Sequence, residues 1–269
     1  MTAVKYVIDH DYHIHSLLSA CSRDPEENAA RILAYGKLNG FRSLCLTDHY
    51  WDERVPGASA WYAPQDTAHI REALPLPQDE GLRFYFGCET DQREDLTLGI
   101  SRERIEELDF VVIPTTHLHM NGFTVRGNET EEERARLWVK RLDALLDREL
   151  PFHKIGIAHL ACKLIAADRH PANVLRLIPA EEKKRLFTKA ALRGAGIELN
   201  GGDFDRRAHS PQDIDETVAL FAVAGECGCR FYLGSDAHHP KDLDRAPETF
   251  AFAVDSLGLT EEDKFRPLG

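Results

Sequence analysis

The sequence has no apolar run close to the roughly 20 residues that a membrane-spanning helix needs. Its start, residues 1–16, also lacks the apolar segment behind a basic head that marks a secretory leader. We therefore expect a protein that does not span a membrane, and the expected compartment is the cytoplasm. Hydrophobic residues make up 43% of the 269 positions and charged residues 29%, a balance that excludes a disordered or collagen-like chain.

Basic residues are comparatively few, since 33 Lys and Arg stand against 45 Asp and Glu and the formal net charge is −12. Proteins that bind nucleic acid draw much of their affinity from Lys and Arg, which neutralise phosphates. We therefore expect no nucleic-acid partner. A small anionic substrate stays compatible with this charge, because bound divalent cations would cancel much of it locally.

The chain also lacks a zinc-ribbon or disulfide pattern. Its six cysteines are Cys21, Cys45, Cys88, Cys162, Cys227 and Cys229. The Cys227-Gly228-Cys229 spacing differs from that of a zinc-ribbon pair. Because a reducing compartment opposes disulfides, we expect reduced and mostly structural cysteines, with Cys21 as the one exception discussed below.

Short apolar or β-branched segments alternate with longer stretches of helical periodicity. The predicted strands are residues 6–14, 43–47, 82–88, 110–116, 154–158, 196–200 and 229–234. The predicted helices are residues 24–40 with Asp24 as N-cap, 129–150, 180–194, 212–225 and 246–257. Near-continuous apolar strands in this alternation predict an α/β fold with a parallel sheet. Without a Gly-rich fingerprint or a break in composition, we expect one barrel-like domain over residues 1–269, with a long loop at 52–78.

The thirteen histidines are concentrated at the ends of the predicted strands. Six of the seven strands end in a His, Asp or Glu, and the eight candidates are His13, His15, His49, Glu89, His117, His159, Asp236 and His238. In a closed parallel barrel these ends converge on the face where active sites lie. Two or three metal ions that share a bridging carboxylate fit so many ligands better than one tetrahedral ion.

The segments that carry these residues resemble the PHP family, named for polymerase and histidinol phosphatase. They are DYHIHSLLS at 11–19, LTDH at 46–49, GCE at 87–89, FVVIPTTH at 110–117, IAH at 157–159 and GSDAH at 234–238. The resemblance implies a distorted (β/α)7 TIM-like barrel with up to three metals at the C-terminal face of the strands. It also implies three ligand sets, namely His13, His15, Glu89 and Asp236; Glu89, His117 and His159; and His49 and His238.

One departure from the family pattern concerns Cys21. Members with three metals often have a further histidine at this position. A thiolate is a competent zinc ligand, so Cys21 either replaces that imidazole or is a small buried residue beside a weak or absent third site.

A rival barrel is that of the amidohydrolases, which also begins with His-x-His. That type usually bridges its metals with a carboxylated lysine on the fourth strand, where this chain has Thr116 and His117. Glu89 can bridge instead, which favours phosphate esters. Hydrolysis of an amide or lactone, and a non-catalytic metal-stabilised module, stay open as alternatives.

The expected activity is histidinol-phosphatase-like cleavage of a small phosphate monoester, with attack by a metal-bridging hydroxide. Two to three divalent ions (zinc, manganese or iron) are expected as cofactors. Glu89, Asp236 and His238 are the expected catalytic residues. The expected substrate contacts are His119, Arg126, Asn200 and Arg206. Asp11 and Asp48 are expected to orient ligand histidines. The sequence does not indicate an oligomeric state.

Overall fold

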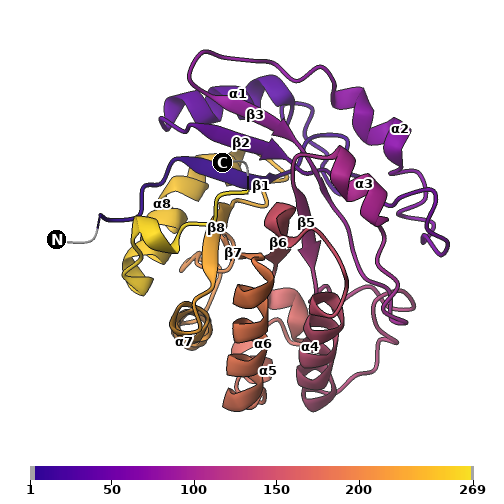
Figure 1. Ribbon diagram of the computed structural model, residues 1–269, viewed down its shortest axis with the longest axis vertical. Helices are drawn as coiled ribbons and strands as arrows, with labels where there is room; N and C mark the ends of the chain where they lie inside the picture. The colour runs from indigo at the N-terminus through magenta and orange to yellow at the C-terminus, as the bar shows by residue number, and fades with distance from the viewer. Residues whose placement is uncertain (1–3, 268–269) are drawn as a thin grey trace.

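The computed structural model describes residues 4–267, in which strands alternate with helices (Figure 1). The strands are β1 (His10–Ile14), β2 (Ser43–Leu46), β3 (Arg83–Phe86), β4 (Cys88–Glu89), β5 (Val111–Pro114), β6 (Ile155–Ala158), β7 (Gly196–Asn200) and β8 (Arg230–Gly234). Every predicted strand segment contains at least one of them. All strand pairings are parallel, in a sheet of order β1-β2-β3 and a second of order β4-β5-β6-β7-β8. The predicted α/β fold with parallel strands is confirmed.

The predicted strand at 82–88 is divided at Gly87, where the chain changes neighbours. The Gly87 N–H donates to the Leu46 carbonyl of β2 at 2.8 Å, whereas the next N–H, of Cys88, donates to the Phe110 carbonyl at 3.3 Å. A Cβ at Gly87 would overlap that Phe110 carbonyl oxygen. Glycine therefore allows the close approach at which one sheet ends and the other begins.

The two sheets also meet between β1 and β8. Here the Asp236 N–H donates to the His13 carbonyl at 2.7 Å, and the His15 N–H donates to the Ala237 carbonyl at 3.0 Å. Among residues 4–267, the strand pairing between the two sheets consists of isolated bridges at Ile14–Ala237 and His49–Glu89. The short strands thus form a barrel-like arrangement, and the expected closed (β/α)7 barrel is not confirmed.

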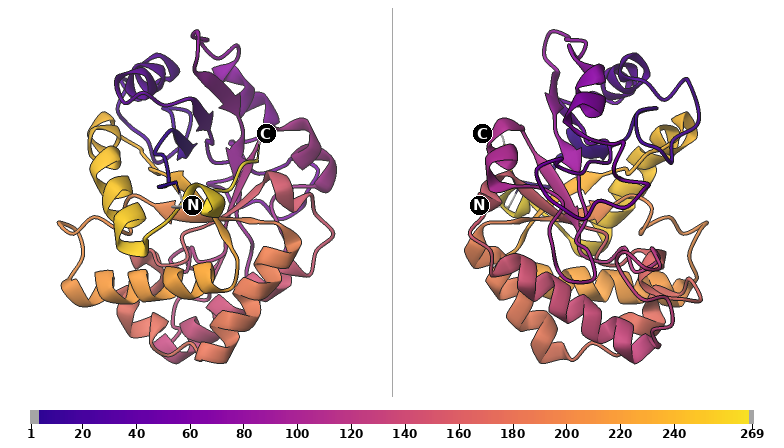
Figure 2. Two further views of the ribbon diagram at one scale, coloured as in Figure 1. Left: turned by 60° about the vertical axis from the view of Figure 1, so that its left-hand side comes forward. Right: turned by 90° about the vertical axis from the view of Figure 1, so that its right-hand side faces the viewer.

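The helices surround the strands (Figure 2). They are α1 (Ala29–Leu38), α2 (Thr67–Ile70), α3 (Arg102–Glu107), α4 (Glu131–Leu146), α5 (Pro171–Leu175), α6 (Ala180–Arg193), α7 (Pro211–Glu226) and α8 (Pro240–Leu257). Around the outside, contacts run in the order α1, α8, α7, α6 and α4. No helix within residues 4–267 has both the length and the apolar character that crossing a membrane requires.

The prediction that Asp24 caps the first helix is wrong. The N-cap is Asn28, whose side chain accepts from the N–H groups of Ala30 and Arg31. Asp24 instead accepts from the Glu26 N–H at 2.9 Å and so closes a turn ahead of the helix. Short polar side chains serve both purposes, and the sequence pattern does not distinguish them.

Candidate metal centre

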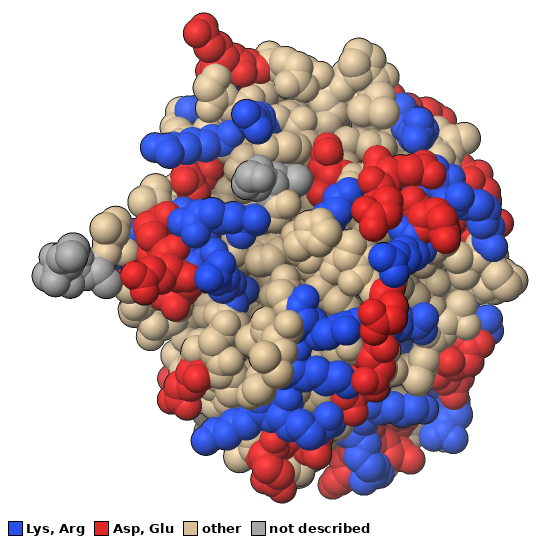
Figure 3. Space-filling model, viewed as in Figure 1, with Lys and Arg blue, Asp and Glu red and all other residues tan. Residues whose placement is uncertain are grey.

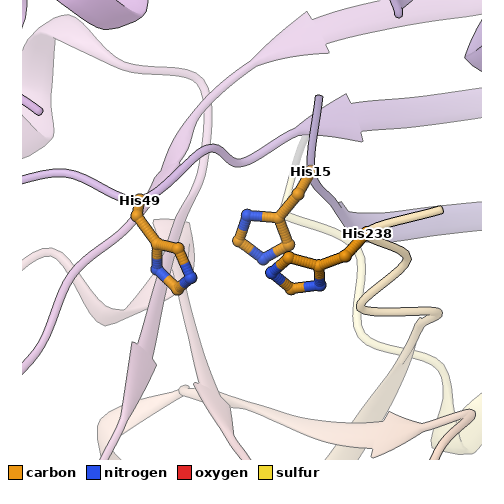
Figure 4. A group of neighbouring side chains, drawn as sticks. All are labelled: His15, His49 and His238. Carbon is orange, nitrogen blue, oxygen red and sulfur yellow. The ribbon is translucent and has the colours of Figure 1, made fainter. Parts of the chain in front are cut away.

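Seven of the eight candidate ligands form two compact groups at or just beyond the C-terminal ends of the strands. Within each group the ligand atoms lie within 4.8 Å of one another. The groups are His15, His49 and His238; and His13, Glu89, His159 and Asp236. Figure 4 shows the three imidazoles of the first group turned toward one another from three separate segments. His117, the eighth candidate, adjoins the second group, with its Nε2 3.9 Å from Glu89 Oε1.

Glu89 belongs to the second group, but its carboxylate also faces the first, and the residue is fully buried. Its Oε2 is 2.9 Å from His49 Nδ1 and 3.3 Å from His15 Nε2. Its Oε1 is 3.2 Å from His159 Nε2. One carboxylate therefore faces both groups, which is the arrangement that a bridging ligand needs.

His15 also lies near both groups. Its Nε2 is 3.1 Å from His13 Nε2 and 3.2 Å from Asp236 Oδ1. The geometry thus pairs His15 with His49 and His238 while keeping it near the partners that the family resemblance implies. The Asp236 side chain is 25% exposed, whereas that of Glu89 is fully covered. Asp236 is thus the carboxylate more open to the adjacent cavity.

Four of the candidate histidines have an acceptor behind Nδ1. The acceptors are Glu198 Oε1 for His13 at 2.5 Å, Ser19 Oγ for His15 at 2.8 Å, Asp91 Oδ2 for His117 at 2.9 Å and the Asp236 carbonyl for His238 at 2.8 Å. An acceptor at Nδ1 assigns the proton to that nitrogen, so the Nε2 lone pair is directed into the centre. Metal-ligating histidines commonly have such a partner behind them.

Two buried atoms at the centre have no hydrogen-bond partner within residues 4–267. They are His49 Nδ1 and Glu89 Oε2, which lie 2.9 Å apart without hydrogen-bond geometry. Buried polar atoms rarely stay without a hydrogen-bond partner. Two such atoms, surrounded by other groups that offer lone pairs, fit a site for a bound cation. Mixed imidazole and carboxylate donors suit zinc, manganese or iron.

The electrostatics of the centre keep its carboxylates ionised. Burial alone would raise the pKa of Glu89, but the imidazoles of His49 and His13 hold that pKa well below its usual range. Burial and nearby His15 lower the pKa of His238 to about 3. At neutral pH His238 is therefore uncharged and has a lone pair to offer.

Two candidate ligands have unusual backbone conformations. His159 has φ of 61° and Asp236 has φ of 53°, in the left-handed region that non-glycine residues seldom occupy. Such conformations are costly and are typical of functional sites. Nearby, a Cβ at Gly234 would overlap Glu198 Oε1 and His13 Cβ. The glycine of the GSDAH segment therefore makes room for the acceptor behind His13.

A cavity of about 540 Å³ opens onto this centre. Glu89, Asp236 and four of the candidate histidines line it, together with Cys21, His119 and a group of apolar side chains. Cys21 is exposed and belongs to neither ligand group, so it is not the small buried residue of the second alternative. Burial and the neighbouring His117 lower the pKa of His119 to about 4, which keeps this predicted substrate contact neutral.

Comparison with known proteins gives matches among solved structures only. No family model matches the chain, and no curated protein matches it. The histidinol phosphate phosphatase of Lactococcus lactis subsp. lactis Il1403, solved with zinc, L-histidinol and phosphate, aligns over 96% of this chain and 98% of its own at 17% identity, with a TM-score of 0.62. A candidate histidinol phosphatase from Listeria monocytogenes aligns over 90% and 100% at 14% identity, with a TM-score of 0.64.

The chain has a PHP-like fold. The resemblance that the sequence motifs indicated is thereby shown at the level of the fold.

Within this PHP-like fold, three supporting residues were missed by the sequence analysis. Glu198 is buried in β7. Its Oε1 is hydrogen-bonded to His13 Nδ1, and its Oε2 accepts from the backbone N–H of His159 at 3.1 Å. Asp91 and Ser19 support His117 and His15. Only Glu198 had a signal in the sequence, because it is a charged residue within the apolar GIELN segment. A buried carboxylate needs a partner, so its position could have indicated a contact with a site residue.

Asp11 and Asp48 act as supports of different kinds. Asp48 accepts from Ser19 Oγ at 2.7 Å, so it orients His15 through that hydroxyl. Asp11 accepts from the backbone N–H of Ser235 at 2.9 Å and fixes the β1–β8 boundary rather than an imidazole.

The structure does not bring three of the four predicted substrate contacts to the cavity. Asn200 is buried behind His159, with Nδ2 3.5 Å from its Nδ1. Arg126 points to Glu129 at 3.6 Å and lines a separate hollow. The Arg206 guanidinium packs over the Phe252 ring at 4.5 Å. A loop position in the sequence does not fix the direction of a long side chain, which accounts for both arginines.

Proposed function

We propose that this protein is a metal-dependent phosphoesterase that hydrolyses a small phosphate monoester. The observation that carries the proposal is the pair of neighbouring ligand groups, both of which Glu89 faces. A cavity large enough for a small molecule opens onto them. The fold shared with histidinol phosphatases supports it.

The proposed cofactors are two to three divalent cations. One would be held by His13, Glu89, His159 and Asp236, a second by His15, His49 and His238, and His117 would add a ligand beside Glu89. Such ions supply a nucleophile near neutral pH and offset the charge of the phosphoryl oxygens.

The chain's own residues have distinct proposed tasks. Glu89 and Asp236 carry the negative charge that holds the cations, since both have pKa values well below the usual range despite burial. Asp236 is the more open of the two and would face the ester bound in the cavity. Glu198 holds the His13 ring in one orientation, with its lone pair directed inward.

Phosphate esters are favoured over amides and lactones by the bridging group. Glu89 faces both ligand groups, as a bridging group would, and no lysine of residues 4–267 lines the cavity.

The reaction class is tested with p-nitrophenyl phosphate beside matched amide and lactone substrates. We expect hydrolysis of the phosphate ester, loss of that activity on chelation and its return on adding zinc or manganese. Hydrolysis of the amide or lactone alone would contradict the proposal.

Glu89→Gln and Asp236→Asn should each lower kcat/KM by more than about a hundredfold, because the charge that holds the cations is lost. The matched control is Glu248→Gln. Glu248 lies on α8 and forms an exposed ion pair with Arg207. Circular dichroism should show the same fold in all variants. Near-normal turnover with full metal content in either site variant would refute the assignment.

A further inference from the structure

One side of the cavity is formed by aromatic and apolar side chains. We call Trp61, Tyr62 and Phe123 the aromatic wall; Met120 and Leu164 also line the cavity. Ring centroids are 4.7 Å apart for Trp61 and Tyr62 and 5.5 Å for Tyr62 and Phe123. Tyr62 is fully buried, whereas Trp61 is 38% exposed, so part of its surface is free for a ligand.

The aromatic wall is in direct contact with the candidate metal centre. The His49 ring centroid is 5.0 Å from that of Trp61 and 6.2 Å from that of Tyr62. A phosphoryl group held at the centre would therefore leave room for its ester group only a few atoms from the wall. The wall would thus contact the leaving group.

The cavity has little to offer a charged leaving group. Among residues 4–267, no Lys or Arg lines it, so a second phosphate or a carboxylate would lack a cationic partner. Its carboxylates are already engaged. Glu89 and Asp236 face the imidazoles, and Asp91 Oδ2 accepts from Tyr62 at 2.5 Å and lies 2.9 Å from His117.

The remaining oxygen, Asp91 Oδ1, does not change this conclusion. It has no hydrogen-bond partner among the described residues, but it is itself buried from solvent. An ammonium group would find neutral partners such as Ser59 and Asn121, but no free carboxylate oxygen among the described residues that line the cavity, so its charge would stay unpaired there.

We propose, resting on the proposed function, that the substrate is a phosphate monoester of an uncharged aromatic alcohol. Water would supply the oxygen that bonds to phosphorus while the bond from phosphorus to the ester oxygen breaks. The products are inorganic phosphate and the alcohol, whose oxygen takes up a proton. The ring would pack against the aromatic wall, where apolar burial and aromatic contacts favour it.

The test compares non-hydrolysable probes by calorimetry on zinc-loaded protein. Benzylphosphonate carries an uncharged ring, 2-aminoethylphosphonate an ammonium group and methylphosphonate neither. We expect benzylphosphonate to bind at least tenfold more tightly than the other two. Equal binding of all three, tighter binding of the amine or no binding of any would overturn the inference.

Substitution of Trp61 tests whether the preference for benzylphosphonate comes from the aromatic wall. Trp61→Ala should lower the ratio of benzylphosphonate affinity to methylphosphonate affinity about tenfold, whereas Trp61→Phe should keep most of that ratio. Leu192→Ala, at an 83% exposed residue of α6, is the control. Unchanged preference in Trp61→Ala would overturn the inference.

Turnover separates the inference from the function on which it rests. Benzyl phosphate, an alkyl ester like ethanolamine phosphate, should have a kcat/KM at least tenfold above that of ethanolamine phosphate. If benzylphosphonate is preferred and no phosphate ester is hydrolysed, the proposed function fails while the preference of the cavity stands. If both esters are hydrolysed equally, the function stands and the inference fails.

Discussion

At the scale of single residues, Glu27 has an unusual environment. Its side chain is fully buried just before α1, and neither carboxylate oxygen has a hydrogen-bond partner among residues 4–267. Burial, with the nearby charge of Asp242, raises the pKa of this carboxyl to about 8. Glu27 is therefore protonated in the folded protein at neutral pH, whereas an unfolded chain would ionise it near pH 4.3.

This difference predicts a pH-dependent cost. Between about pH 4.3 and pH 8 the folded state retains a proton that the unfolded state has lost, so the Glu27 contribution to stability falls as pH rises. Relative to wild type, Glu27→Gln should raise the free energy of unfolding by about 1–3 kcal/mol more at pH 8 than at pH 5. Urea unfolding at both pH values measures this, with Glu248→Gln as control. An equal effect of Glu27→Gln at both pH values would contradict the account.

Individual site residues were predictable to different degrees. The eight candidate ligands could be located because they recur at one position in successive strand units. Glu198 lacked such a signal, since its partner is the far nitrogen of His13, 185 positions away in the sequence. The left-handed backbone of His159 and Asp236 is also set by tertiary contacts rather than by residue type.

At the scale of elements, α4 holds the loops that carry the site. Three side chains on its buried face, spaced i, i+4 and i+7, donate hydrogen bonds to backbone carbonyl groups of those loops. Arg134 bonds to Leu118 and Ile165, Trp138 to Leu160, and Arg141 to Gln92, Arg93, Thr115 and Thr124. The carbonyls flank His117 and His159, so this helix positions two candidate ligands from behind.

Arg141→Met should weaken this support, because several carbonyls bonded to a buried guanidinium lose their donor. We expect a loss of about 2–4 kcal/mol in the free energy of unfolding and weaker metal binding. Arg136→Met, on the exposed face of the same helix, is the matched control. Urea unfolding and zinc titration measure the two effects. Indistinguishable behaviour of the two variants would show that the contacts do not position the loops.

Among the elements, strands were predicted better than helix boundaries. The apolar runs marked every strand segment, whereas α8 begins at Pro240 instead of residue 246 and α1 begins at Ala29. The helices α3 and α5 have six and five residues, too few for periodicity to show. The division at Gly87 depends on a contact with Phe110, which the local sequence does not reveal.

At the scale of the whole molecule, the candidate ligands lie where the two sheets meet. His13 and Asp236 flank the boundary between β1 and β8. At the second boundary between the sheets, His49 and Glu89 form an isolated bridge. Bound cations would therefore join sheets that share few backbone hydrogen bonds. The face in Figure 3 shows Lys and Arg interspersed with Asp and Glu. Ion pairs of Asp143 with Arg185 and Lys189 also join α4 to α6. The expectation of no nucleic-acid partner stays a prediction.

The most direct test of the central claim is the metal content per chain, measured by elemental analysis on protein purified without chelator. Turnover of p-nitrophenyl phosphate is measured on the same sample. The account predicts two to three divalent ions per chain and turnover that disappears when they are removed. Protein that is metal-free and cannot be reconstituted with zinc, manganese or iron would contradict it.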